Sequence, residues 1–231
     1  MKAVEVHNLT KVFVPHNSWP WSKNFPVTTA LQDVSFSLEQ GKTLGIMGAN
    51  GSGKSTLLRI LAGILQPTKG TVSTTGNVAA VIDMSACFHN DLTVQDNIAL
   101  YSELSGAGKV LRSQSADIIS FAELETYERR PLRELSRGMK TRLVFSTVIR
   151  VPADIYLFDE AFSGGDERFK KRAQDRIKKL QTEGKTLVMA SHRPVFLKQV
   201  ASLGLVLDQG RLAFYGPLAE AIPPYRKLLG I

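Results

Sequence analysis

The stretch of sequence that decides the fold is Gly48-Ala49-Asn50-Gly51-Ser52-Gly53-Lys54-Ser55. It matches the pattern G-x-x-x-x-G-K-[ST], follows a short apolar run at 43–47, and precedes a segment at 55–65 in which leucines recur at helical spacing. Glycines in such a turn let backbone N–H groups converge on phosphate oxygens, and the following helix directs the positive end of its dipole at the same anion. The stretch therefore predicts a phosphate-binding loop, and a chance glycine-rich turn is the weaker interpretation.

Two side chains of this loop suit a nucleoside triphosphate. Lys54 would neutralise the β- and γ-phosphates, and Ser55 would supply a hydroxyl to Mg²⁺. We therefore expect ATP and Mg²⁺ at this site.

A pair of acids follows a second apolar strand. Residues 154–159 read DIYLFD, and Glu160 comes next. Asp159 would hold Mg²⁺, and Glu160 would polarise the attacking water as the general base. Such a pair can also be two surface carboxylates at the end of a strand, but the phosphate loop upstream favours the catalytic interpretation.

The order of the expected elements indicates an α/β fold. Strands are expected at 2–14, 31–41, 43–48, 154–159 and 186–191. Residues 91–148 have a mostly helical pattern, and a hairpin is expected around Gln209-Gly210. The pattern predicts a parallel-sheet core interrupted by a helical insertion.

The bulk properties limit the class of protein. The chain has 231 residues and a net charge of +8, and it contains no uncharged apolar stretch of about 18 residues, so no membrane span is expected. The first residues lack the apolar region of a signal peptide, and the single cysteine, Cys87, allows no internal disulfide, which fits the cytoplasm. The basic charge suits nucleic acid, an anionic membrane surface or phosphate ligands without choosing among them. The basic run at 168–179 is either a solvated helix face or a contact with anionic lipid.

Four motifs in this order resemble those of the ATP-binding subunits of ABC transporters. NGSGKST at 50–56 resembles the family's phosphate loop, and LSRGM at 135–139 resembles its signature, usually written LSGGQ. Asp166 stands where the family has its D-loop aspartate, and we count it among the nucleotide-site residues. Ser191-His192 resembles the switch-histidine loop. Together the motifs span nearly the whole chain.

The resemblance implies roles for further residues. Thr56 would join the phosphate loop, and Ser136 and Gly138 would present a helix N-terminus to nucleotide. His192 would contact the γ-phosphate, and Phe13 would stack on adenine. The alternatives are an ordinary histidine in a turn for His192, a core aromatic for Phe13 and a simple helix N-cap for Ser136.

One family motif is altered. The family has a glutamine in the loop that joins the core to the helical region, and no glutamine lies between Gly70 and Thr93. Asp83 is the candidate for that position, where it could reach Mg²⁺ or water, and the alternative is a solvated turn residue. We expect Phe88 to be exposed in a groove for the membrane subunit, with burial in the helical core as the alternative.

The resemblance is closest to ATPase subunits of polysaccharide exporters, above all those of capsular polysaccharide. The residues that carry it are SRGMK at 136–140, DEAFSGGDERF at 159–169 and CFHNDLT at 87–93. It implies a P-loop NTPase (RecA-like) core with an antiparallel β edge and an inserted helical signature subdomain. We expect a single ATPase domain over 1–231, with its core at 1–84 and 149–231 and the helical subdomain at about 85–148.

The function implied is ATP hydrolysis that powers export of a capsule-like polysaccharide across the inner membrane. Two copies would sandwich ATP head to tail on the cytoplasmic side of that membrane, and a separate membrane-spanning permease would handle the polysaccharide. No carbohydrate-binding domain is expected after the core, and no nucleic-acid partner is expected. The alternatives are an exporter of a teichoic acid or O-antigen type polymer and, less favoured, a soluble ABC ATPase without a transport role.

Overall fold

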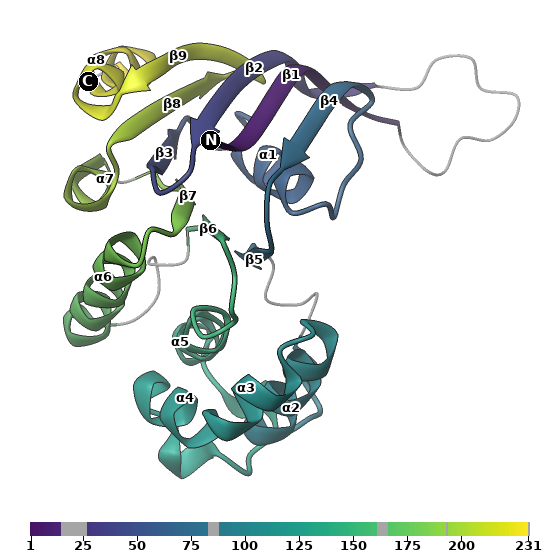
Figure 1. Ribbon diagram of the computed structural model, residues 1–231, viewed down its shortest axis with the longest axis vertical. Helices are drawn as coiled ribbons and strands as arrows, with labels where there is room; N and C mark the ends of the chain where they lie inside the picture. The colour runs from purple at the N-terminus through teal and green to yellow at the C-terminus, as the bar shows by residue number, and fades with distance from the viewer. Residues whose placement is uncertain (15–26, 83–87, 161–165, 193, 231) are drawn as a thin grey trace, which may run out of the picture. The chain divides into compact units, whose positions relative to one another are not determined.

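The computed structural model describes residues 1–14, 27–82, 88–160, 166–192 and 194–230 (Figure 1). These residues fall into two compact units. The first unit joins Met1–Gly76 to Thr186–Ile231, and the second unit is Asn77–Lys185. The expected division into a core and a helical subdomain at about 85–148 uses different boundaries and stays a prediction.

The first unit contains an antiparallel sheet of three strands in the order β2-β1-β4. The strands are β1 (Lys2–Phe13), β2 (Thr28–Glu39) and β4 (Lys69–Thr74). In β1 the side chains of Val4, Val6 and Leu9 are buried, whereas those of His7 and Asn8 are exposed. This half-buried pattern is typical of an antiparallel sheet with one face on the core.

A second sheet of the first unit provides the edge on which the nucleotide motifs lie. Strand β3 (Thr43–Met47) is flanked in parallel by β7 (Thr186–Ala190) and β8 (Leu203–Asp208). Every residue of β3 and of β7 is buried, as expected of a strand covered on both faces. Strand β9 (Arg211–Pro217) runs antiparallel to β8.

The turn between β8 and β9 confirms the expected hairpin. Gln209 and Gly210 have φ angles of 45° and 80°. Two consecutive positive φ angles are the signature of the tight two-residue turn that matches strand twist. The backbone N–H of Gln32 donates to the carbonyl of Gly210 at 2.8 Å, which ties this hairpin to β2.

Helices also belong to the described part of the first unit. They are α1 (Lys54–Leu61), α7 (Pro194–Val200) and α8 (Leu218–Leu229). Leu57, Leu58 and Leu61 of α1 are buried, which confirms the helical spacing of the leucines. Helix α8 packs on β8, where Gly204 leaves room for Ala221, since a Cβ at Gly204 would lie 2.4 Å from the Ala221 Cβ.

The second unit is mostly helical and contains two short parallel strands. The strands are β5 (Val78–Val81) and β6 (Ile155–Asp159). Its α-helices are α2 (Val94–Leu104), α3 (Gly108–Ser113), α4 (Ser115–Ala122), α5 (Arg137–Val148) and α6 (Glu167–Thr182), with 3-10 turns at Glu125–Tyr127 and Leu132–Glu134. The helical pattern expected at 91–148 is therefore confirmed.

Aromatic rings join the helices of the second unit. Phe145 of α5 lies 5.8 Å from Phe169 of α6 and 5.8 Å from Phe158 of β6, measured between ring centroids. Phe121 of α4 lies 5.9 Å from Phe169 in an edge-on arrangement. Phe145, Phe158 and Phe169 are at most 1% exposed, so this cluster forms the apolar centre of the unit.

Candidate functional site

The phosphate loop lies between β3 and α1, as the sequence predicts. Gly53 is the N-cap of α1 with a φ of 103°, a conformation that L side chains rarely adopt. A Cβ at Gly53 would lie 2.5 Å from the carbonyl oxygen of Ala30, and one at Gly48 would lie 2.3 Å from Ser52 Oγ. A Cβ at Gly48 would also lie 2.6 Å from the carbonyl oxygen of Leu207, so close approach of other chain atoms explains both glycines.

The lysine of the loop is buried against the loop backbone. Lys54 is 6% exposed, and its Nζ donates to the carbonyls of Gly48 and Ala49 at 2.8 Å each. The Ser52 hydroxyl is also buried and makes no hydrogen bond within the described part of the chain. A buried cation and an unsatisfied hydroxyl in one loop suit a phosphate group, whose oxygens accept hydrogen bonds.

The remaining loop residues lie where an anion could reach their backbone. Ala49, Asn50 and Gly51 are exposed, and Ser55 and Thr56 are half-buried in the first turn of α1. The first N–H groups of a helix have no partner within it, so they are available to a bound anion.

The structure brings His192 to the same sheet edge as the phosphate loop. The backbone N–H of Ser191, directly after β7, donates to the carbonyl of Ile46 in β3 at 3.1 Å. Because β3 and β7 are parallel neighbours, His192 and the phosphate loop both follow carboxyl ends of strands at one edge. The Tyr225 hydroxyl donates to the carbonyl of His192 at 3.3 Å and so ties this turn to α8.

Phe13 is not a buried core aromatic. It is the last residue of β1 and is 38% exposed, with Lys11 Nζ at 5.2 Å from its ring centroid. An exposed ring that already attracts a cation offers a flat face for stacking. Its contact with adenine stays a prediction.

The acid pair belongs to the second unit. Asp159 is the last residue of β6, whose four preceding residues are buried, and Glu160 follows with a φ of 48°. A left-handed glutamate is a strained conformation that costs on the order of 1 kcal/mol or more, and such strain occurs often at functional sites. Asp159 and Glu160 are half-buried at the strand end, as expected. Asp83, the candidate for the altered loop, lies outside the described residues.

The signature residues begin α5. Ser136 is the N-cap, and its hydroxyl accepts from the backbone N–H of Met139 at 3.3 Å. Gly138 lies in the first turn, which carries no acidic residue. Lys140 Nζ donates to Asn90 Oδ1 at 3.1 Å, so the start of α5 is tied to the segment before α2. Ser136 is thus a helix N-cap, and a nucleotide role would add to this structural one.

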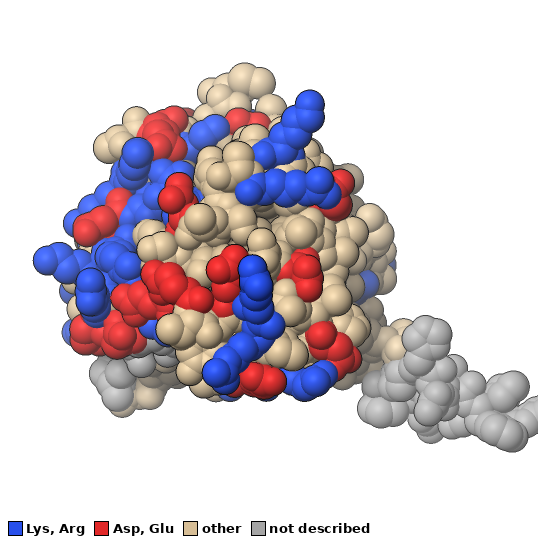
Figure 2. Space-filling view, turned by 90° about the horizontal axis from the view of Figure 1, so that it is seen from below, with Lys and Arg blue, Asp and Glu red and all other residues tan. Residues whose placement is uncertain are grey.

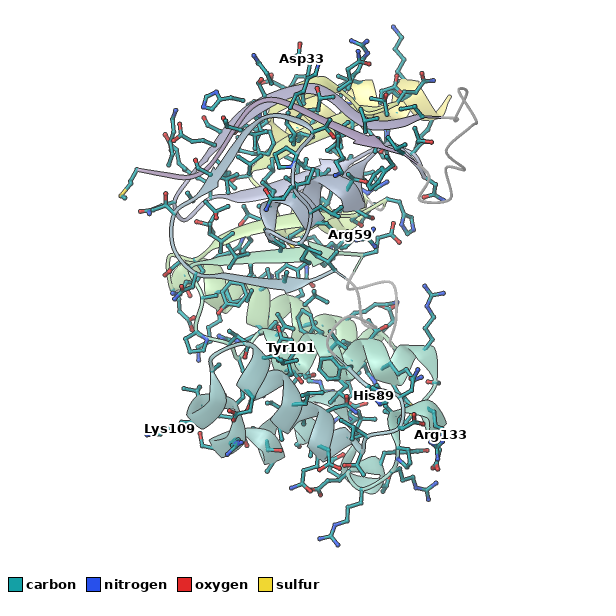
Figure 3. The ribbon with its side chains drawn as sticks, turned by 90° about the vertical axis from the view of Figure 1, so that its right-hand side faces the viewer. Asp33, Arg59, His89, Tyr101, Lys109 and Arg133 are labelled. Atoms are coloured by element: carbon teal, nitrogen blue, oxygen red, sulfur yellow. The ribbon has the colours of Figure 1, made fainter. Side chains whose placement is uncertain are left out.

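The expected exposure of Phe88 is wrong. Phe88 is 6% exposed, and its ring stacks on Tyr101 with centroids 5.5 Å apart, because α2 presents its buried face to this segment. The neighbouring backbone is held by Asn97, which is fully buried, accepts from the N–H of His89 at 2.6 Å and donates to the carbonyl of His89 at 3.0 Å. Figure 3 labels Tyr101 and His89 in this part of the second unit.

Asp166 is the N-cap of α6. Its Oδ1 accepts from the backbone N–H of Phe169 at 2.8 Å. That hydrogen bond, together with the positive charge of Arg142, holds the pKa of the Asp166 carboxyl below its ordinary value. Asp166 therefore stays ionised at neutral pH.

The described residues contain neither a ready-made metal cluster nor a membrane-spanning helix. Among them, no group of three or more His, Cys, Asp or Glu side chains is arranged to hold a metal ion. Magnesium needs only one or two protein oxygens when phosphates and water supply the others, so a cluster of this kind is not required for it. Within the same residues, no helix combines the length and apolarity needed to cross a membrane.

A network around Glu123 in the second unit was missed by sequence reasoning. Glu123 accepts from Arg142 of α5 and Arg172 of α6, residues far apart in the chain. Pairs separated by 19 and 49 positions have no local spacing rule, so the sequence carries no signal for them.

Comparison with known proteins agrees with these motifs. The family described as ABC transporter matches residues 31–163. An O-antigen export system ATP-binding protein of Klebsiella pneumoniae is 33% identical over 87% of this chain and 82% of its own length. A teichoic acids export ATP-binding protein of Lactococcus lactis is 35% identical over 90% of this chain, and an O-antigen export ATP-binding protein of Myxococcus xanthus is 33% identical over 91%.

The chain spans only about half the length of some of these relatives. It covers 48% of the Myxococcus protein and 45% of the Lactococcus protein.

A solved structure has the same fold. It is a dimeric ATP-binding cassette in a post-hydrolysis state bound to ADP and Pi, with a TM-score of 0.80 at 22% identity, over 93% of this chain and 98% of that one. The expected α/β fold of a P-loop NTPase is confirmed. The family match covers more than half of the residues, and its motifs stand on the predicted strands and helices, so the chain belongs to the ABC transporter family.

Proposed function

We propose that this chain binds and hydrolyses ATP and thereby powers the export of a cell-surface polysaccharide. The observation that carries the proposal is the phosphate loop, in which a buried lysine and an unsatisfied serine hydroxyl meet at the N-terminus of α1. This arrangement suits the phosphates of a nucleoside triphosphate.

The chemistry assigns a role to each predicted residue. Lys54 would neutralise charge on the β- and γ-phosphates, and Ser55 and Asp159 would hold Mg²⁺, which neutralises the charge that develops on the phosphate oxygens. Glu160 would accept the proton of the attacking water, and His192 would contact the γ-phosphate. The phosphate loop and His192 share one sheet edge of the first unit, which supports their joint action.

A second copy of the chain would complete the site. In this proposal Ser136 and Gly138 of one copy meet the nucleotide held by the other, with Asp166 near the same interface. The backbone N–H groups at the start of α5 are suited to an anion. ATP would then hold two copies together, and hydrolysis would release them, which makes the nucleotide a two-state switch.

The relatives support a polymer as cargo. The proteins compared above are named for export of O-antigen and of teichoic acids. We extend that class to this chain and place it on the cytoplasmic face of the inner membrane, beside a separate membrane-spanning permease. The capsule-like cargo favoured by the sequence is the finer proposal, and the names of these relatives favour an O-antigen or teichoic acid type polymer equally well.

The ATPase proposal is tested with purified protein. Wild type is expected to bind and hydrolyse ATP in the presence of Mg²⁺, whereas Glu160→Gln should keep ATP binding and lose turnover by at least about 10²-fold. Lys54→Ala should lose binding as well. Equal turnover by wild type and Glu160→Gln would show that Glu160 is not the base.

The cargo proposal is tested in the native host. The gene is deleted and restored as wild type or as Lys54→Ala, and polysaccharide at the cell surface is compared with polysaccharide inside. Internal accumulation that only wild type relieves supports export driven by ATP. If the amounts of surface and internal polysaccharide do not change, the polysaccharide cargo is refuted. The ATPase proposal would still be tested separately by the assay with purified protein.

A further inference from the structure

Glu123 occupies a position that links three helices of the second unit. It is the C-cap of α4, with a left-handed φ of 56°. Its Oε2 accepts from Arg142 of α5 at 2.7 Å, and its Oε1 accepts from Arg172 of α6 at 2.6 Å. Each carboxylate oxygen thus holds a different helix.

These ion pairs are shielded from water. The side chain of Arg142 is 14% exposed, and those of Glu123 and Arg172 are 30% and 32% exposed. The Nε atoms of both arginines are buried and make no hydrogen bond in the described chain, so Glu123 is the main acceptor for the two guanidinium groups. Loss of one partner of such a pair destabilises the folded state, because it leaves the other charge partly buried and unpaired.

Most of the groups around these ion pairs are cationic or aromatic. Arg172 lies 5.3 Å and Arg150 5.1 Å from the ring centroid of Phe121, and Arg168 Nε lies 3.9 Å from Glu123 Oε1. Asp166 Oδ2 lies 4.0 Å from Arg142. Without the charge of Glu123, several guanidinium groups would face one another across the joint between α5 and α6.

The two arginines stand at equivalent places on their helices. Arg142 is six residues after the N-cap Ser136, and Arg172 is six residues after the N-cap Asp166, since 142 − 136 and 172 − 166 are both six. At 1.5 Å per residue, each ion pair holds its helix about 9 Å from the N-terminus. One carboxylate therefore contacts both helices at the same distance from their N-termini.

We propose that Glu123 is a positioning residue for the nucleotide site: it fixes Ser136 and Asp166 relative to each other through Arg142 and Arg172. The inference rests on the proposed function, because it assigns these two N-caps to an ATP-bound interface between copies. Glu123 itself touches no substrate in this proposal. Its charge orients two helices that the aromatic cluster already holds together.

The test compares Glu123→Gln with wild type in the full chain. Because the phosphate loop belongs to the first unit, the Kd for a fluorescent ATP analogue is expected to stay within twofold. The turnover number is expected to fall at least tenfold. ATP-dependent dimerisation, measured in a Glu160→Gln background, is expected to weaken at least tenfold. Glu103→Gln is the matched control, because Glu103 pairs with Arg112 at 2.7 Å on the surface of the same unit, and all three quantities should stay unchanged.

A double variant separates positioning from a general loss of stability. If Arg172 acts through Glu123, then Glu123→Gln combined with Arg172→Gln should be no more impaired in turnover than the worse single variant. Multiplied effects of the two single variants would overturn the proposal. A parallel fall in analogue affinity and turnover would also overturn it, because that pattern indicates a structural role alone.

The remaining outcomes distinguish a folding defect, a failure of the proposed function and a failure of this inference. If Glu123→Gln fails to fold by circular dichroism, Glu123→Asp takes its place, because it keeps the charge and shortens the reach; it should lose turnover severalfold at unchanged analogue affinity, and wild-type turnover would refute the proposal. An inactive wild-type protein would refute the proposed ATPase function and this inference with it. An active wild type with a fully active Glu123→Gln would refute this inference alone.

Discussion

Replacement of Gly53 by alanine should destabilise the protein far more than the same replacement at Gly51. Both glycines belong to the phosphate loop and both have positive φ angles, 103° at Gly53 and 79° at Gly51. They differ in their surroundings. A Cβ at Gly53 would lie 2.5 Å from the Ala30 carbonyl oxygen and 2.7 Å from Leu31 Cδ2, whereas a Cβ at Gly51 would have no protein atom within 4 Å.

The expected magnitudes follow from these two terms. A left-handed alanine costs about 1–2 kcal/mol, and this is the whole cost at Gly51. At Gly53 the backbone clash adds about 1–3 kcal/mol, because the carbonyl of Ala30 or the start of α1 must move. Taking the middle of each range, the cost is about 1.5 kcal/mol at Gly51 and about 3.5 kcal/mol at Gly53. For a chain of this length each kcal/mol lowers Tm by about 2–4 °C, so we expect a fall of about 7–14 °C for Gly53→Ala and about 3–6 °C for Gly51→Ala.

The assay is thermal unfolding by circular dichroism without nucleotide, at matched protein concentrations. ATP binding is measured on the same samples at a temperature where both variants are folded. Gly53→Ala should also bind ATP more weakly, since a shift of the α1 N-terminus moves the N–H groups that face phosphate. Equal falls in Tm for the two variants would refute the reasoning, because the Ala30 carbonyl would then contribute nothing.

Two further predictions concern the second unit. Burial raises the pKa of the Tyr156 hydroxyl, which donates to the Val151 carbonyl at 2.6 Å, so wild type should lose stability as pH rises above about 10, where the unfolded tyrosine ionises first. Tyr156→Phe should lower the free energy of unfolding by about 1 kcal/mol at neutral pH. In urea unfolding measured from pH 8 to 11, this variant should not show the loss of stability that comes from ionisation of Tyr156. A pH profile identical to that of wild type would contradict the assignment. Phe169→Ala should cost about 3–5 kcal/mol, because Phe169 is fully buried in the aromatic cluster, whereas Leu104→Ala at a 65% exposed position should cost less than about 0.5 kcal/mol in the same urea assay. Similar costs for these two substitutions would show that the cluster does not form the centre of the unit.

Local rules account for most of what the sequence predicts correctly. The phosphate loop and the Gln209-Gly210 hairpin depend on neighbours in the chain, and each stands where the sequence predicts it. Thr93 accepts from the backbone N–H of Asp96 at 3.1 Å, as a capping residue should. Such short-range interactions can be predicted from a single sequence, because the interacting groups are only a few residues apart.

Contacts between distant segments explain what the sequence does not predict. Phe88 is expected from the family resemblance to be exposed in a groove for the membrane subunit, but its ring is buried against Tyr101 of α2. The left-handed φ of Glu160 is equally unexpected, because nothing in the DE dipeptide requires it. The burial of Phe88 and the backbone conformation of Glu160 depend on how segments distant in the sequence pack together. A motif that identifies the family does not predict this packing.

Most basic residues of the run at 168–179 form ion pairs in the folded protein, which the sequence alone does not predict. It contains Arg168, Lys170, Lys171, Arg172, Arg176, Lys178 and Lys179. Four of these seven form ion pairs within the second unit: Arg168 and Arg172 with Glu123, Lys170 with Glu167, and Arg176 with Glu183. Figure 2 shows the same mixture on one face of the molecule, where lysine and arginine lie beside aspartate and glutamate.

The remaining charges limit any contact with lipid through this helix. Lys171, Lys178 and Lys179 are exposed in α6. Each basic residue near an anionic membrane surface contributes about 1 kcal/mol, so these three would supply about 3 kcal/mol, or roughly two orders of magnitude in partitioning. That is too little for stable attachment, which agrees with the interpretation of a solvated helix face. The three exposed lysines of α6 would therefore not hold the chain at an anionic membrane surface by themselves.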